Sequence, residues 1–119
     1  KLKNMEVIAR SSFVRTSPRK LALVANAVRG LTPQAAVNQL KLMPKRAAEA
    51  ILNVFQQAIG NAKNNFKLSP ESLAVKTMQV QEGPRFKRRD KGHGARFDSG
   101  LKRKRMAHIV VILESTETK

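Results

Sequence analysis

The chain is organised around residues 84–108, PRFKRRDKGHGARFDSGLKRKRMAH, which lie between two apolar segments. This stretch holds two acids, Asp90 and Asp98, and ten basic residues: Arg85, Lys87, Arg88, Arg89, Lys91, Arg96, Lys102, Arg103, Lys104 and Arg105. Its net charge of +8 is half of the chain's +16, concentrated in 25 of 119 residues. So much like charge cannot be buried in a core, so we predict a projecting arm whose binding partner is strongly anionic.

The centre and flanks of this stretch predict a β-hairpin. The central Lys91-Gly92-His93-Gly94-Ala95 favours a turn, because glycine adopts positive φ angles without steric cost. Met78 and Val80 precede the arm and apolar residues 109–113 follow it, as expected of two strands that anchor it. We expect residues 106–113 to form a central strand that is buried on both faces.

Two further signals predict strands before the arm. Residues 5–13 alternate in polarity and place Val7 and Phe13 on one face, which we expect to be buried. The strand that begins at Leu73 changes its apolar phase near residues 76–77, which predicts a β-bulge there.

Three helices are predicted between these strands. Ser17-Pro18 and Thr32-Pro33 each supply an N-cap residue and a proline at the first helical position, which predicts helices over 17–29 and 32–41. A third helix over 44–64 would begin at Pro44, and we expect Gly60 within it to mark a close packing contact. Its expected buried face comprises Ala48, Ile51, Leu52, Phe55, Ile59 and Ala62.

Together these elements predict an α+β fold: three helices packed on a small three-stranded antiparallel sheet, with a long protruding β-hairpin. The length of 119 residues and the absence of a linker or repeat predict one domain, residues 1–119, which includes the arm at 84–108.

The sequence offers little for catalysis or metal binding. It contains no Cys, its two histidines are His93 and His108, and its acids do not cluster. The Gly92-His93-Gly94 segment is not followed by the helix pattern that a phosphate-binding loop needs. We therefore expect no enzymatic activity, no cofactor and no metal, and we expect His108 to make a local hydrogen bond.

The charge favours nucleic acid as the partner. Lys and Arg along a narrow ribbon can neutralise phosphates, and Phe86 and Phe97 either stack on unpaired bases or pack on each other across the strands. Asp90 and Asp98 are expected to pair with neighbouring arginines. A second basic group, Arg15, Arg19 and Lys20, surrounds the start of the first helix, where free N–H groups favour phosphate, unless Ser17 simply caps the helix. Arg29, Lys41, Lys45 and Arg46 would extend this group.

Two other functions stay open at this point. The helices over 17–29 and 32–41 resemble a helix-turn-helix DNA-binding regulator in their spacing, although the second offers few base-reading side chains. A polybasic protein can also bind an anionic membrane surface, but the longest apolar run, 109–113, is far shorter than the roughly 20 residues that span a bilayer. We expect no membrane insertion and no small-molecule substrate.

Several segments together resemble the large-subunit ribosomal protein twenty-two family, of the universal, bacterial type. These are the first-helix segment FVRTSPRK (13–20) with Val28-Arg29-Gly30, the third-helix end AIGNA (58–62) with Asn64-Asn65, and Glu82-Gly83-Pro84 with residues 102–105 and 108–111. The resemblance covers about residues 5–114.

The resemblance implies a structural protein of the large ribosomal subunit that binds the large rRNA, contacts neighbouring ribosomal proteins and supports subunit assembly and translation. Its hairpin would line the nascent-peptide exit tunnel, with a tip near the nascent polypeptide at Lys91, Gly92, His93, Gly94, Ala95 and Arg96. The expected rRNA contacts are Arg15, Ser17, Arg19, Lys20, Arg29, Lys45, Arg46, Arg85, Lys87, Arg88, Arg89, Lys91, His93, Arg96, Lys102, Arg103, Lys104 and Arg105.

The tip departs from the family pattern. A typical bacterial member has a tip rich in Arg, Ala and Gly, without the Asp90, His93, Phe97 and Asp98 of this chain. This difference, with a first residue that is Lys1 and not Met, favours an organellar ribosome. A mitochondrial location is the first expectation, with plastid and bacterial cytoplasm as alternatives.

Overall fold

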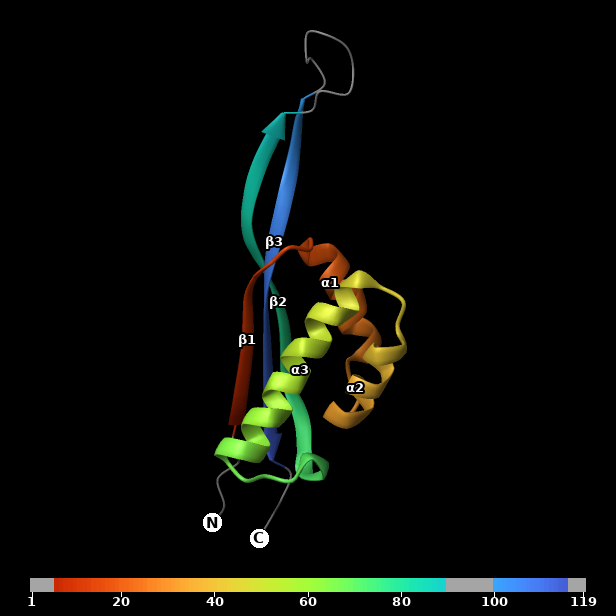
Figure 1. The fold of residues 1–119 in the computed structure, drawn as a ribbon, viewed down its shortest axis with the longest axis vertical. Helices are drawn as coiled ribbons and strands as arrows, with labels where there is room; N and C mark the ends of the chain where they lie inside the picture. Colours follow the sequence, from red (N-terminus) through yellow and green to blue (C-terminus); the bar gives the residue numbers. More distant parts are fainter. Residues whose placement is uncertain (1–5, 90–99, 116–119) are drawn as a thin grey trace.

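The computed structural model describes residues 6–89 and 100–115 and contains one antiparallel sheet covered by helices (Figure 1). The strands are β1 (Glu6–Val14), β2 (Leu73–Arg89) and β3 (Leu101–Ser115), in the spatial order β1-β3-β2. The helices are α1 (Pro18–Val28), α2 (Pro33–Leu42), α3 (Arg46–Asn65) and the short 3-10 helix η1 (Pro70–Ser72). The predicted α+β fold with three main helices is confirmed.

The helices cover one face of the sheet, and the core lies between the two layers (Figure 1). The helix-facing residues of β3 from Ala107 to Leu113 are fully buried, whereas His108 and Val110 on the other face are only half-buried. Ile8 of β1 is 46% exposed on that face. The prediction that the central strand is buried on both faces is therefore wrong, because no described helix covers the second face.

Both proline-containing helix starts are confirmed. The Ser17 hydroxyl oxygen accepts a hydrogen bond from the Lys20 backbone N–H at 3.3 Å, and the Thr32 hydroxyl accepts one from the Ala35 N–H at 3.4 Å. Each bond satisfies a donor that has no partner within the helix. Gly30 follows α1 with a φ of 92°, the left-handed conformation that ends helices.

The third helix starts later than predicted. Lys45 has extended backbone angles (φ −126°, ψ 137°), so α3 begins at Arg46 and Pro44 lies outside it. Lys45 occupies the N-cap position without a side-chain cap, unlike Ser17 of α1.

The buried face of α3 is also broader than predicted, because this helix contacts the sheet as well as α1 and α2. Val54 and Ala58 are fully buried, whereas Leu52 and Ile59 are half-buried at the edges of the core. A β-carbon added to Gly60 would meet nothing within 4 Å, so the predicted close contact at this glycine is wrong.

The end of β1 is irregular, and this changes the environment of Phe13. Its pairing with β3 shifts between Ser11 and Val14, and Phe13 has a φ of 58° and is 61% exposed. The prediction of a buried Phe13 is wrong because the shift breaks the alternation that would turn it inward. Its N–H donates a hydrogen bond to His108 Nδ1 at 3.0 Å, so His108 does bond, but to a residue distant in sequence.

Strand β2 contains two register shifts against β3. The first, between Val75 and Thr77, confirms the predicted bulge. The second lies between Glu82 and Arg85, where Gly83 and Pro84 interrupt the pairing. Proline has no N–H to donate, so it is tolerated at such a position.

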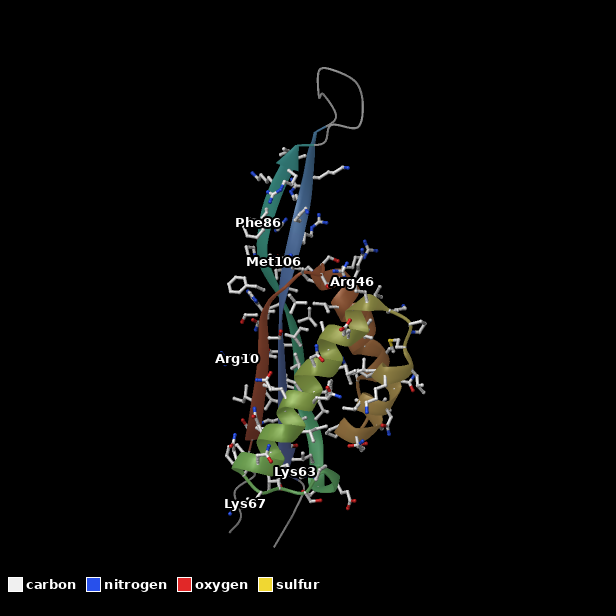
Figure 2. All side chains as sticks on the ribbon, in the orientation of Figure 1. Arg10, Arg46, Lys63, Lys67, Phe86 and Met106 are labelled. Carbon is white, nitrogen blue, oxygen red and sulfur yellow. The ribbon has the colours of Figure 1, made fainter. Side chains whose placement is uncertain are left out.

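Beyond the second shift, β2 and β3 continue past the helices as the arm (Figures 1 and 2). The radius of gyration is 18.0 Å, whereas a compact chain of this length has about 13–14 Å. The principal extents are 69 × 26 × 21 Å. The predicted protruding hairpin is therefore confirmed over the described residues.

Candidate nucleic-acid interface

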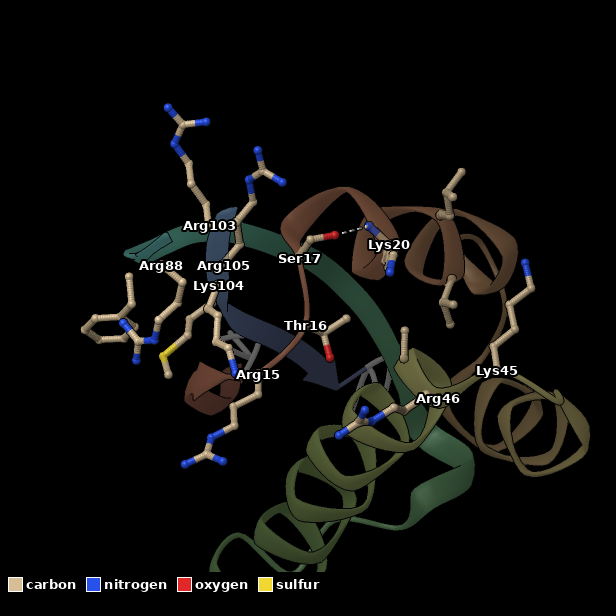
Figure 3. Close-up of a pocket in the computed structure, with 15 residues that line it drawn as sticks. Arg15, Thr16, Ser17, Lys20, Lys45, Arg46, Arg88, Arg103, Lys104 and Arg105 are labelled. Carbon is tan, nitrogen blue, oxygen red and sulfur yellow. Dashed lines mark hydrogen bonds between the residues drawn. The ribbon is translucent and has the colours of Figure 1, made fainter. Parts of the chain in front are cut away.

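An open groove of about 1060 Å³ lies where the arm leaves the body (Figure 3). Three segments that are distant in sequence meet there: the connection from β1 to α1, the start of α3 and the arm strands. We call it the basic groove, because its lining includes eight cationic residues: Arg15, Lys20, Lys45, Arg46, Arg88, Arg103, Lys104 and Arg105.

A second groove of about 680 Å³ adjoins the basic groove on the side of α1. It shares Ser17, Lys20 and Arg105 with the basic groove and adds Arg19 and Arg85. Glu82 is an acid in its lining, and Glu82 Oε2 lies 3.7 Å from Arg85 Nη2. Both groups are exposed, so solvent screens this ion pair.

The starts of α1 and α3 bring cationic side chains to the basic groove, although at α1 the Lys20 N–H is capped by Ser17 and Pro18 has no N–H. The first turn of α1 contains no acid, so Arg15 and Lys20 lie beside the positive end of its dipole without compensation. The N-terminus of α3 has no side-chain cap, and Lys45 and Arg46 lie at this end. The first turn of α3 contains Glu49, so an anion in the groove would offset mainly the charge at the start of α1.

The arm presents cations on both of its faces, because cationic pairs occur at successive positions along it, and in each pair the register places like charges opposite each other. Arg85 pairs with Arg105, Lys87 with Arg103 and Arg88 with Lys102. Directly opposed like charges destabilise a strand pair, and a two-stranded ribbon is marginal in water even without them. A bound polyanion would therefore stabilise the arm.

The basic groove also has an apolar lining, of which the sequence analysis considered Phe86 but missed the rest. Leu23 is 61% exposed and Phe86 44% exposed, and Met106 and Ala47 lie in the same lining. Leu23 is an apolar residue outside the buried stripe of α1, and this position in the sequence could have indicated that it contributes to a binding surface. Apolar surface beneath a cationic rim suits nucleotides, which carry flat bases as well as phosphates.

Most of the expected contact residues whose side chains the structure describes line these grooves, but Arg29, Lys87 and Lys102 lie elsewhere. Lys87 and Lys102 are exposed on the arm beyond them. Arg29 lies at the end of α1, where its Nη1 donates to the Met78 carbonyl at 3.4 Å and its Nε donates to Asn26 Oδ1 at 3.2 Å. The guanidinium thus connects α1 to β2.

The predictions for the hairpin tip lie outside the described residues. They concern Asp90, Lys91, Gly92, His93, Gly94, Ala95, Arg96, Phe97 and Asp98. Arg89 ends β2 and pairs in register with Leu101.

Residues 6–89 and 100–115 contain no group of three or more side chains that could hold a metal ion. Within the same residues, none of the helices has the length and apolar character needed to cross a membrane.

Comparisons with known proteins show the family to which the chain belongs. The family model described as "Ribosomal protein L22p/L17e" matches residues 9–114. Among curated proteins, the large ribosomal subunit protein uL22 of Pseudothermotoga lettingae is 39% identical, covering 98% of this chain and 82% of the relative. The uL22 protein of Lawsonia intracellularis is 42% identical, covering 92% of this chain and 96% of the relative. The chain belongs to the ribosomal protein L22p/L17e family.

Proposed function

We propose that this protein is a structural constituent of the large ribosomal subunit that binds large-subunit rRNA through the basic groove and the arm. The observation that carries the proposal is the convergence of eight cationic residues from three separate segments on one groove with an apolar lining. Membership of a ribosomal protein family supports this role. The role is one of binding and assembly and not of catalysis.

Neutralised phosphates account for the mode of binding. Each Lys or Arg that contacts a phosphate releases condensed counterions, which makes affinity depend strongly on salt. Arginine can also bind phosphate oxygens with two parallel hydrogen bonds, and the basic groove includes five arginines: Arg15, Arg46, Arg88, Arg103 and Arg105.

A helix-turn-helix regulator is less well supported by the geometry. Helix α2 would have to present base-reading side chains, but it lines neither groove, and its one cationic residue is Lys41. The cations instead concentrate at the arm base, at the end of the body away from Lys63 and Lys67 (Figure 2).

The test compares two double variants of equal charge. Arg15→Gln with Arg46→Gln removes two groove cations, and Lys63→Gln with Lys67→Gln removes two exposed cations outside both grooves. We expect the first variant to bind large-subunit rRNA about tenfold more weakly and the second to bind nearly as the unchanged chain does. Filter binding at fixed salt measures both, and sedimentation with large subunits checks assembly. Equal losses in the two variants would contradict a specific groove.

The arm is proposed to line the nascent-peptide exit tunnel, with Lys91, Gly92, His93, Gly94, Ala95 and Arg96 close to the nascent polypeptide. Family membership and the elongated shape support this placement. A photoreactive residue at Gly94, in assembled large subunits, should cross-link to a stalled nascent chain. The same probe at Lys63 serves as the control and should not.

The compartment stays a prediction. The relatives named above are bacterial and give no support to the mitochondrial location over the plastid or bacterial alternatives. Fractionation of the source cells, followed by sedimentation of large subunits from each compartment, would decide among the three.

A further inference from the structure

The exposed side chain of Phe13 has no role in the core or in either groove. It is 61% exposed and lines neither of them. Its φ of 58° is a left-handed conformation, which glycine adopts freely and a phenylalanine rarely does. A glycine at this irregular end of β1 would adopt the same φ without strain. The backbone conformation therefore does not explain why residue 13 is an aromatic residue.

Two contacts hold this ring in a fixed position. The Phe13 N–H donates to His108 Nδ1 at 3.0 Å, and the Phe13 and His108 rings meet edge to face, with centroids 5.0 Å apart and planes at 90°. This arrangement covers at most one face of the Phe13 ring. At least one face of the Phe13 ring is therefore exposed to solvent, while His108 of the central strand β3 holds the ring in place.

The sheet face that carries His108 holds polar and cationic residues together with the half-buried Val110. His108 is paired in register with Gln81 of β2, and both lie on the face of the sheet that the helices leave uncovered. Arg10 is exposed and lies opposite Val110, two residues along β3 on the same face. An open aromatic face beside a guanidinium and a side-chain amide can hold an unpaired nucleobase and its phosphate.

We propose that Phe13 is a stacking platform for an unpaired RNA base, with Arg10 binding an adjacent phosphate. This inference rests on the proposed RNA-binding function and extends it to a second surface, outside the basic groove. Ile8 and Val110 make part of this face apolar, but the exposed Arg10 and the chain's net charge of +16 favour a polyanion over a protein as the partner at this ring.

The test uses the full chain and two polyanions, single-stranded polyadenylate, which has bases, and heparin, which has none. Phe13→Leu keeps an apolar side chain but removes the aromatic face, and it should bind polyadenylate about tenfold more weakly with unchanged heparin binding. Phe13→Trp should retain the polyadenylate affinity, and Arg10→Gln should weaken binding to both polyanions. Phe13→Gly fits the backbone without strain, so it should lose polyadenylate affinity while melting no lower than the unchanged chain.

The outcomes separate this inference from the proposed function. If the unchanged chain binds neither polyadenylate nor rRNA, the proposed function fails and the stacking proposal fails with it. If the unchanged chain binds RNA and Phe13→Leu binds equally well, the stacking proposal alone is overturned. If Phe13→Leu keeps its RNA affinity but fails to join large subunits, the ring contacts a protein, which also overturns it.

Discussion

The Gly83→Ala substitution tests whether the arm base is tightly packed. Gly83 lies at the second register shift of β2, directly against the central strand. A β-carbon at this position would lie 3.0 Å from both the carbonyl carbon and the oxygen of Met106, and 3.3 Å from the Ala107 nitrogen. These are backbone atoms of β3, so they cannot move away as the end of a flexible side chain can. We expect the alanine to force β2 and β3 apart where the arm begins.

The direction of the stability change follows from two opposing effects. Replacing glycine by alanine reduces the entropy of the unfolded chain and stabilises the fold by about 0.4–1 kcal/mol where the alanine fits. Overpacking costs about 1–3 kcal/mol, and the contacts at Gly83 are with atoms that cannot easily yield. The overpacking cost is larger, so Gly83→Ala should lower the free energy of unfolding by about 1–2 kcal/mol and Tm by about 3–10 °C.

Gly60→Ala is the matched control for the same chemical change. A β-carbon at Gly60 meets nothing within 4 Å, and the residue lies inside α3, where alanine is the better helix former. This variant should be more stable by about 0.5–1 kcal/mol. Urea and thermal denaturation followed by circular dichroism measure both variants. A Gly83→Ala protein as stable as the unchanged chain would refute the reasoning on the arm base.

Three further predictions concern the groove, the helix starts and the one described side chain with a shifted pKa. If each of the eight groove cations neutralises one phosphate, a plot of the logarithm of rRNA affinity against the logarithm of salt concentration should fall with a slope of at least about 6 in magnitude. Arg103→Gln should reduce the magnitude of that slope by about one. An unchanged slope would place Arg103 away from phosphate. Ser17→Ala and Thr32→Ala should each destabilise the protein by about 1 kcal/mol in urea titrations, and no loss would show that the caps are not formed in solution. A hydrogen bond and the charge of Glu6 raise the pKa of Lys76, so Glu6→Gln should lower that pKa toward its ordinary value in an NMR titration, and an unmoved pKa would mean that the pair is absent. Because the Lys76 pKa is raised, any stability that the pair contributes is present below the ordinary lysine pKa and is lost as pH rises through the raised value.

The parts of the fold that could be predicted from sequence depend on short-range rules. A Ser or Thr followed by proline defines a helix start within a few residues, and both Ser17 and Thr32 cap as expected. The change of apolar phase near Lys76 likewise predicted a bulge, because alternation along one strand fixes which residues face the core.

The predictions of burial and close contact failed where a segment distant in the sequence decides what surrounds a residue. Whether Val110 is covered depends on which sheet face the helices occupy, and apolar composition cannot show that. The exposure of Phe13 depends on a register shift against a strand about a hundred residues later. No atom of a distant segment lies within 4 Å of a β-carbon built at Gly60, and the pattern along the helix cannot show that.

The sequence predicted the cationic residues of the candidate interface but not the apolar residues that lie among them. The cations near Ser17 and along the arm follow from the sequence, and most of them converge on two adjoining grooves. Leu23 and Met106 could not be assigned to this surface, because the residues that surround them come from other segments. Arg29 matched the cationic pattern but bonds to the Met78 carbonyl.

The central position of β3 has a consequence for how the protein forms during its own synthesis. The core pairing joins Glu6 with Glu114 and Leu73 with Ser115, so the first strand made has no partner until the third one appears. Closing a loop of this length costs entropy that is repaid only when β3 inserts between β1 and β2. The helices can form early, but the sheet cannot close before β3 has left the ribosome. Until then the chain exposes the apolar face that the sheet later covers, and a chaperone that acts at this stage would protect it from aggregation.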